Sequence, residues 1–287
     1  MFRPVRVVAL IVCAALSVVA APGTARAQQG QKPKPAQPEQ RPYQPEIGQE
    51  GKDVIWVPTA DTLVETMLDM AKVTREDYVL DLGSGDGRTV IAAARRGARA
   101  HGIEYNPEMV ELSKRNADAA GVPGLATFEK ADLFETDLSR ATVVTMFLLP
   151  SINLELRPKL LGLKPGTRIV SNTFTMEEWK ADRTEVVTQD CTNYCTALLW
   201  IVPARVQGAW QLPRGRRLRL AQTFQFVSGS LAAGGTTRPI SRGRLRGDRL
   251  TFTAGGSRYD ARVTGNTMEG TVTAGLKVQP FTATRTK

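Results

Sequence analysis

Apolar positions along residues 53–203 alternate between short continuous runs and stretches with helical spacing. Segments of strand length that contain apolar residues lie at 78–82, 100–104, 126–130, 142–149 and 168–171. Helical spacing begins at residue 61 and returns at 88–96, 107–120 and 152–161. Strands that alternate with helices predict βαβ units and a mostly parallel sheet with helices on both faces. We therefore predict an α/β fold with a doubly wound sheet over 53–203.

An antiparallel hairpin is expected to complete this sheet. Apolar stretches at 185–187 and 197–202 flank Cys191, Cys195 and the three residues between them, which are typical of a turn. Cysteines that face each other across such a turn can meet the geometry of a disulfide. We favour a disulfide between them, with two free thiols as the alternative. A metal site is not expected, because the single histidine, His101, lies far away in the sequence.

From residue 208 onward the pattern changes to short strands separated by glycine-containing turns. Turn signals roughly every 8–12 residues predict a small antiparallel sheet or a partial barrel. Residues 208–287 are therefore expected to form a small all-β domain. Its expected strands are 218–226, 244–252, 259–263, 268–272 and 281–285.

Residues 1–27 have the parts of a secretory signal peptide. Two arginines precede an apolar run at 7–21, and Ala25-Arg26-Ala27 supplies the small residues of a cleavage site. The run is shorter than the ~20 residues that a membrane-spanning helix needs. We predict an exported protein, periplasmic or secreted, with an uncleaved N-terminal membrane anchor as the alternative. Residues 28–52, with seven glutamines and five prolines, predict a disordered linker.

The formal net charge of +10 is unevenly distributed. Residues 28–203 carry 20 basic and 25 acidic side chains, whereas residues 204–287 carry 15 basic and 3 acidic ones. A basic face on the C-terminal domain would attract an acidic protein or anionic groups of the cell envelope. The alternative is that these arginines lie on ordinary solvated strand faces. No nucleic acid is expected as a partner of an exported protein. The clustered arginines are Arg214, Arg216, Arg217, Arg219, Arg242, Arg244, Arg246 and Arg249.

A glycine-rich turn at 83–87 is the segment most informative about chemistry. It follows the first buried strand and opens a helix, the place where doubly wound sheets bind nucleotides. Glu104 ends the next strand, nineteen residues after Gly85, where it is placed to accept hydrogen bonds from both hydroxyls of a ribose. Asp81 and Asp86 flank the turn and would repel a pyrophosphate. They suit the ammonium and sulfonium groups of S-adenosylmethionine.

The segment 79–88 resembles the glycine-rich motif of class I S-adenosylmethionine-dependent methyltransferases. Further segments, in the same order over roughly 150 residues, are similar to bacterial relatives of the lysine methyltransferase that modifies the ATP synthase c-subunit. The resemblance implies a Rossmann-like fold, S-adenosylmethionine as the cofactor, and a protein lysine or a similar amine as the methyl acceptor. It ends near residue 203. The further segments are 57–59, 103–107, 131–134, 148–150 and 163–171.

The resemblance also implies roles for particular residues. The glycine turn would hold the methionine and ribose parts of the cofactor, with Asp81 near its amino group, Glu104 at its ribose and Asp132 at its adenine. No general base is evident, and methyl transfer to a neutral amine needs little acid–base help because proximity and in-line geometry supply most of the effect. The implied cofactor-binding residues are Val57, Pro58, Thr59, Asp81, Gly83, Ser84, Gly85, Gly87, Glu104, Asp132 and Leu133, and the implied substrate-facing residues are Leu149 and Pro150.

A protein that only binds a ligand is the main alternative to an enzyme. S-Adenosylmethionine is made in the cytosol, so an exported methyltransferase has no evident supply of it. The same fold would then serve an exported nucleoside-binding or envelope-assembly protein without catalytic activity. Incubation with labelled S-adenosylmethionine separates the two, because an enzyme transfers the label and a binding protein only retains it.

Overall fold

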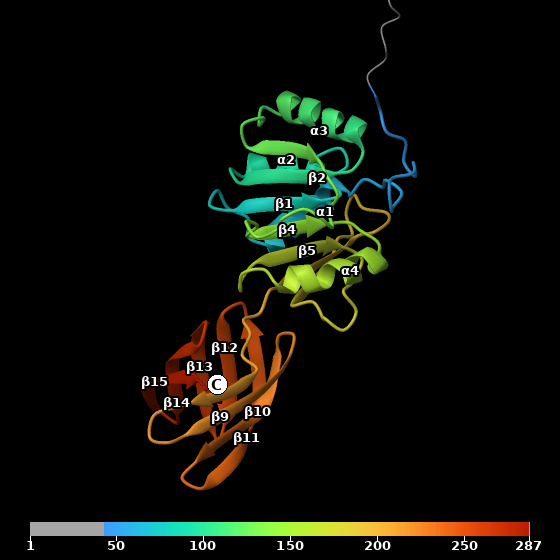
Figure 1. Ribbon diagram of the computed structural model, residues 1–287. Coiled ribbons are helices and arrows are strands. Elements are labelled where there is room, and N and C mark those ends of the chain that lie inside the picture. Colours follow the sequence, from blue (N-terminus) through green and yellow to red (C-terminus); the bar gives the residue numbers. More distant parts are fainter. Residues whose placement is uncertain (1–42, 287) are drawn as a thin grey trace, which may run out of the picture. The chain divides into compact units, whose positions relative to one another are not determined.

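The structure, a computed structural model, describes residues 43–286 (Figure 1). The predicted signal peptide and the predicted linker as far as residue 42 lie outside the described residues. The chain from Tyr43 onward forms one compact unit. Within 43–286, no helix combines the length and the apolar character that crossing a membrane requires.

A seven-stranded sheet in the order β3-β2-β1-β4-β5-β7-β6 occupies the first part of this unit. Strands β1 to β5 are parallel, and β7 runs antiparallel to both β5 and β6. The predicted doubly wound sheet with a terminal antiparallel hairpin is confirmed. Its strands are β1 (Tyr78–Leu82), β2 (Arg99–Glu104), β3 (Ala126–Lys130), β4 (Val143–Met146), β5 (Arg168–Asn172), β6 (Arg183–Val186) and β7 (Thr196–Ile201).

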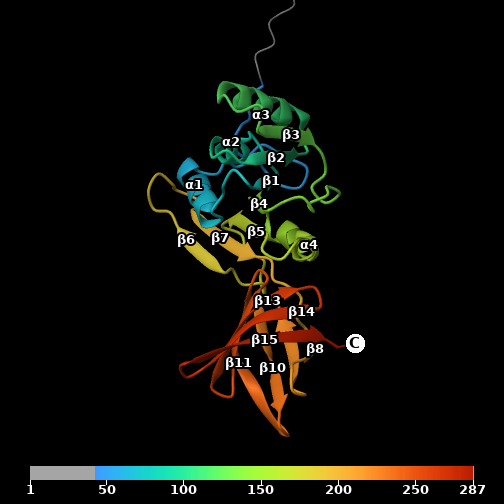
Figure 2. The same ribbon diagram turned by 90° about the vertical axis from the view of Figure 1, so that its left-hand side faces the viewer.

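Helices cover both faces of this sheet (Figure 2). Side chains alternate between the two faces along a strand, so Val79 of β1 joins one core and Leu80 and Leu82 join the other. The first core contains the buried faces of α1 (Asp61–Met70), α2 (Arg88–Arg95) and α3 (Pro107–Ala119), and the second contains that of α4 (Pro150–Leu161).

Eight antiparallel strands after the sheet close into a barrel, in which β15 pairs with β8. Trp210 and Phe252 lie in its interior. The expected all-β domain is present, but the segment 244–252 is two strands separated by a two-residue turn. The strands are β8 (Gly208–Gln211), β9 (Arg217–Thr223), β10 (Phe226–Ala233), β11 (Thr236–Arg246), β12 (Arg249–Ala254), β13 (Ser257–Thr264), β14 (Thr267–Ala274) and β15 (Lys277–Arg285).

Side chains of the barrel contact the segment between β5 and β6. Phe224, between β9 and β10, stacks on Trp179 with ring centroids 6.0 Å apart. Arg244 of β11 forms an ion pair of 2.7 Å with Asp182. Trp179 is completely buried, so removal of the barrel would expose a large apolar side chain of the sheet domain.

Candidate active site

A cavity of about 680 Å³ lies at the carboxyl ends of β1, β2 and β4. Doubly wound sheets bind ligands at this edge, and the volume falls within the ~300–1,000 Å³ of small-molecule sites. Most of the sequence-predicted site residues meet here, whereas Gly87 and Pro150 are not in the wall. The predicted residues in the wall are Val57, Pro58, Thr59, Asp81, Gly83, Ser84, Gly85, Glu104, Asp132, Leu133 and Leu149.

Residues 83–86 of the glycine turn line the cavity next to the indole of Trp56. Gly85 has a left-handed backbone (φ +55°), and a Cβ atom there would lie 2.7 Å from the indole nitrogen of Trp56. A residue with a side chain would therefore meet both backbone strain and a steric clash. The absence of a side chain at this position is what allows Trp56 to approach the turn.

Gly87 lies outside the cavity wall and packs inside the sheet domain. It precedes the first residue of α2 with φ +83°, and a Cβ atom there would lie 2.8 Å from ring carbons of Phe128 and 2.9 Å from the Cβ of Ser113. Gly87 thus permits close packing of α2 against β3 and α3. Pro150 is the first residue of α4, where a proline is favoured because no backbone donor is needed.

The carboxylate of Glu104 bridges the glycine turn and the start of α3. Its Oε2 accepts a hydrogen bond from the backbone N–H of Gly85 (2.9 Å), and its Oε1 accepts one from that of Asn106 (2.9 Å). Each carboxylate oxygen can accept a second hydrogen bond. Two backbone donors therefore fix the orientation of Glu104 and leave it able to accept from the hydroxyls of a ribose.

Asp81 is a buried carboxyl group in the cavity wall, with only 5% of the residue exposed. Burial raises its pKa to about 7, and the nearby charges of Glu104 and Asp86 add to this effect. A hydrogen bond of 2.5 Å from the Thr145 hydroxyl partly opposes it. A cation bound next to Asp81 would favour the ionised form.

Asp86 does not offer the free carboxylate that the sequence predicted. The guanidinium of Arg88 donates to both of its oxygens, with Nε 3.0 Å from Oδ1 and Nη2 2.6 Å from Oδ2. Arg88 also donates to the backbone oxygen of Thr59 at 2.8 Å. This pairing offsets the charge of Asp86, so the attraction of a cationic ligand rests on Asp81 and Glu104.

The segment before α1 forms part of the cavity wall, although the sequence predicted a disordered linker as far as residue 52. Residues 43–52 are not a disordered linker here, because the segment folds back on itself with Glu50 paired to Ile55. Residues 49–57 line the cavity. Lys52 forms an ion pair of 2.5 Å with Asp132 and lies 5.0 Å from the ring centroid of Tyr105. Lys52 lowers the pKa of Asp132, which remains ionised beside the pocket.

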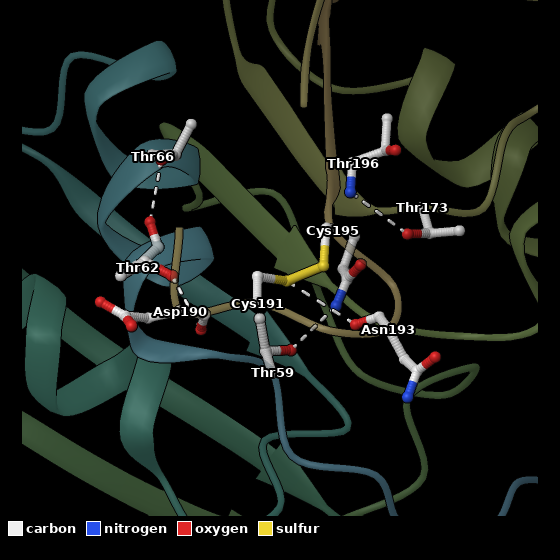
Figure 3. The surroundings of a disulfide bond; sticks show 10 residues. Thr59, Thr62, Thr66, Thr173, Asp190, Cys191, Asn193, Cys195 and Thr196 are labelled. Atoms are coloured by element: carbon white, nitrogen blue, oxygen red, sulfur yellow. Dashed lines mark hydrogen bonds between the residues drawn. A yellow bond between two sulfur atoms is a disulfide. The ribbon is translucent and has the colours of Figure 1, made fainter. Parts of the chain in front are cut away.

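One part of the wall is aromatic and was not predicted from the sequence. It contains Phe147, Phe174 and Tyr194, which come from three different loops. Tyr194 lies in the turn between β6 and β7, where the structure joins Cys191 to Cys195 through a disulfide (Figure 3). This is the pairing that the sequence favours. Within 43–286, no group of three or more potential metal ligands is present.

Comparisons with known proteins identify the family of this chain. The family model of the ANTKMT methyltransferase domain matches residues 81–183. A protein-lysine N-methyltransferase of Saccharolobus islandicus is 43% identical over 152 residues, which cover 52% of this chain and 94% of that protein. The chain belongs to this family of methyltransferases. The resemblance inferred from the motifs is thereby confirmed.

Two other matches are also to methyltransferases. The mouse lysine N-methyltransferase of the ATP synthase c-subunit is 38% identical over 130 residues, or 45% of this chain and 52% of the relative. The chain therefore spans about half the length of this relative. A crystal structure of an RNA methyltransferase from Salinibacter ruber in complex with S-adenosylhomocysteine is 48% identical with a TM-score of 0.49, covering 52% of this chain and 96% of that one.

S-Adenosylmethionine is the cofactor of this class I methyltransferase, and the residues of the cavity fit it. Glu104 has free lone pairs for the ribose, and the carboxyl of Asp81 suits a cationic amino group. The roles of Glu104 and Asp81 in binding are predictions, which the substitutions Glu104→Ala and Asp81→Asn test.

Proposed function

We propose that this methyltransferase transfers the methyl group of S-adenosylmethionine to the side-chain amine of a lysine in a protein. The main support is that acidic and aromatic side chains occupy different parts of the cavity wall. Asp81, Asp86 and Glu104 lie in the glycine turn or directly beside it, whereas Phe147, Leu149, Phe174 and Tyr194 supply a part of the wall with only apolar and aromatic side chains. This aromatic part suits an uncharged amine on an alkyl chain, and the family relatives named above support a lysine.

The transfer requires positioning rather than proton relay. S-Adenosylmethionine supplies an electrophilic methyl group on a positively charged sulfur. The cavity residues would hold the acceptor nitrogen in line with the bond from sulfur to methyl, so that the carbon–nitrogen bond forms as the carbon–sulfur bond breaks. The nitrogen gives one proton to water, and the products are a methylated amine and S-adenosylhomocysteine. No residue of the aromatic wall needs to act as a base.

Transfer from radiolabelled S-adenosylmethionine tests this proposal. The purified chain is incubated with an extract of the source organism, and the label is expected in protein, sensitive to protease, resistant to nuclease and located on lysine by mass spectrometry. Label in RNA, lipid or small molecules would contradict a lysine acceptor. Cofactor that binds but is never transferred would instead support the non-catalytic binding or assembly protein.

We further propose that the protein is exported. The signal-peptide pattern of residues 1–27 supports this, and a disulfide is typical of proteins in an oxidising compartment. Fractionation of cells that express the whole chain is expected to place a mature protein beginning at Gln28 outside the cytosol. An intact N-terminus in the membrane fraction would indicate an anchor, and a cytosolic protein would contradict export.

We also propose that the barrel recruits an acidic partner or anionic surface through its arginines. Residues 204–287 have 15 basic and 3 acidic side chains. Two of the clustered arginines are engaged, Arg244 with Asp182 and Arg249 with Asp260. On β9, Arg217 and Arg219 are exposed while Leu218 and Leu220 are buried, so these two arginines extend from the outer face of the barrel.

Charge reversal on β9 tests recruitment without removing the barrel. The double variant Arg217→Glu and Arg219→Glu is expected to slow transfer to an acidic protein by roughly tenfold at low salt, because complementary charge raises the encounter rate. The difference should shrink at high salt, where the Debye length falls to ~3 Å. Rates of transfer at several salt concentrations measure both effects.

A matched variant separates local recruitment from net charge. Arg115→Glu with Lys130→Glu changes the net charge equally, and both residues are exposed on the sheet domain outside the cavity wall. We expect this control to transfer methyl groups nearly as fast as the unchanged protein. Equal losses in both double variants would contradict a role for the barrel. Truncation is a poorer test, because it would expose Trp179.

A further inference from the structure

Three aromatic rings form a compact cluster in the cavity wall. Phe147 and Phe174 stack with ring centroids 5.9 Å apart, and Tyr194 lies 5.3 Å from the first ring and 5.7 Å from the second. The three residues follow β4, follow β5 and lie between β6 and β7. All three belong to the cavity wall, so they are not merely part of the interior of the sheet domain.

The cluster lies beside the glycine turn. Leu148 follows Phe147 directly, and a Cβ atom at Gly83 would lie 3.1 Å from the Cδ2 of Leu148. The chain that leaves β4 therefore passes from the aromatic cluster at Phe147 to the glycine turn at Leu148. A side chain held between these rings would lie next to the part of the cavity assigned to the methionine end of the cofactor.

Two of the rings are held in place from outside the cavity. The backbone oxygen of Phe174 accepts hydrogen bonds from the Ser171 hydroxyl (3.0 Å) and from the Asn153 amide of α4 (3.2 Å). Tyr194 has a left-handed backbone (φ +56°), which is unfavourable for a residue with a Cβ. The disulfide between Cys191 and Cys195 closes the turn around it (Figure 3).

Neighbouring contacts fix this turn to the rest of the sheet domain. The Thr62 hydroxyl of α1 donates to the backbone oxygen of Asp190 at 3.4 Å (Figure 3). The backbone N–H of Thr173 donates to the backbone oxygen of Thr196 at 2.7 Å. Tyr194 nevertheless remains 43% exposed. A large ring that is both anchored and exposed at the mouth of a cavity is available to a ligand.

We infer that Phe147, Phe174 and Tyr194 form the binding site for the acceptor side chain, and that the disulfide positions Tyr194 as its third wall. This inference rests on the proposed lysine acceptor. The methylene chain of a lysine would pack against the rings, and its amine or methylated ammonium is attracted to their faces. Metal ions and anions are poorly matched, because the three rings offer neither ligands nor donors other than the Tyr194 hydroxyl.

Substitution of Tyr194 tests the site in transfer assays. Tyr194→Ala is expected to raise the KM for the protein acceptor roughly tenfold, since a lost cation–π and aromatic contact weakens binding by that order. Tyr194→Phe keeps the ring and should change KM less than about twofold. The Kd of S-adenosylmethionine should remain unchanged in both. Val186→Ala, an exposed position on the same hairpin outside the cavity wall, is the matched control.

If the disulfide acts by positioning Tyr194, its removal should change the acceptor KM and leave the cofactor Kd unchanged. The double variant Cys191→Ala with Cys195→Ala is expected to raise the acceptor KM as Tyr194→Ala does, with the same cofactor Kd. The triple variant should have the same acceptor KM as Tyr194→Ala alone, because the disulfide can no longer act through a ring that is absent. Multiplied effects in the triple variant, or a changed cofactor Kd with an unchanged acceptor KM, would overturn the inference.

A binding experiment keeps this inference separate from the proposed function. n-Butyltrimethylammonium, a mimic of the end of a methylated lysine, is titrated into the full chain saturated with S-adenosylhomocysteine and followed by NMR. We expect shifts of the Tyr194 and Phe147 ring resonances that Tyr194→Ala abolishes and Val186→Ala retains. Absence of such binding in the unchanged protein overturns the aromatic site, even if lysine is methylated. Binding without any transfer to protein overturns only the proposed function.

Discussion

Replacing Glu104 by alanine is expected to weaken the binding of S-adenosylmethionine by about 100- to 10,000-fold. Hydrogen bonds to a charged group contribute roughly 1.5–3 kcal/mol each, and the carboxylate is placed to accept two from the ribose. The variant also leaves the backbone N–H groups of Gly85 and Asn106 without their acceptor. Isothermal titration calorimetry measures the change in Kd.

A nearby glutamate provides the control for this substitution. Glu108 lies in the first turn of α3, is exposed and is outside the cavity wall. Glu108→Ala removes an equal charge close to the site and is expected to leave the Kd within about twofold. Thermal unfolding of both variants shows whether the turn still folds. A folded Glu104→Ala protein with unchanged affinity would remove Glu104 from the cofactor site.

The sheet domain could be predicted closely because its elements are marked by local signals. The strands at 78–82 and 126–130 have the predicted bounds, since turn residues mark one end of each: Gly83 follows the first, and Pro123 and Gly124 precede the second. Helix α4 begins two residues earlier than expected, because Pro150 is favoured as a first helical residue. Closure of the barrel could not be predicted, since it depends on the pairing of β15 with β8 between residues more than 70 positions apart.

The candidate site shows the same division between local and distant information. Most of the glycine turn and Glu104 line the cavity, and they could be found from the sequence because they lie in one strand–turn–helix motif and at the end of the next strand. Lys52 and the aromatic cluster line the cavity only because segments distant in the sequence come together in the fold, and no sequence motif marks them. The charge of Asp86 was misjudged although its partner Arg88 is two residues away, because a spacing cannot show that two side chains turn toward each other.

The titration of Asp81 makes both the stability of the protein and its affinity for the cofactor depend on pH. Its pKa is raised from the ordinary 3.8 to about 7. The protein without cofactor is therefore stabilised by the neutral form at low pH, and this contribution is lost as the pH rises from about 4 through 7. The cationic amino group of S-adenosylmethionine would favour the opposite, ionised form, so binding releases a proton below pH 7.

Affinity for S-adenosylmethionine is accordingly expected to rise by up to about tenfold per pH unit between pH 5 and 7 and to level off above. The amino group of the cofactor stays protonated in this window, since α-amino groups have pKa values of about 7.7–8.0, and Asp81 is the group that changes charge. Calorimetry in buffers of different ionisation enthalpy should detect the released proton at pH 6. Asp81→Asn keeps the shape and can still accept from the Thr145 hydroxyl, but it should show a flat profile with no proton release. If the variant retains the slope, another group titrates, and the placement of the amino group beside Asp81 is wrong.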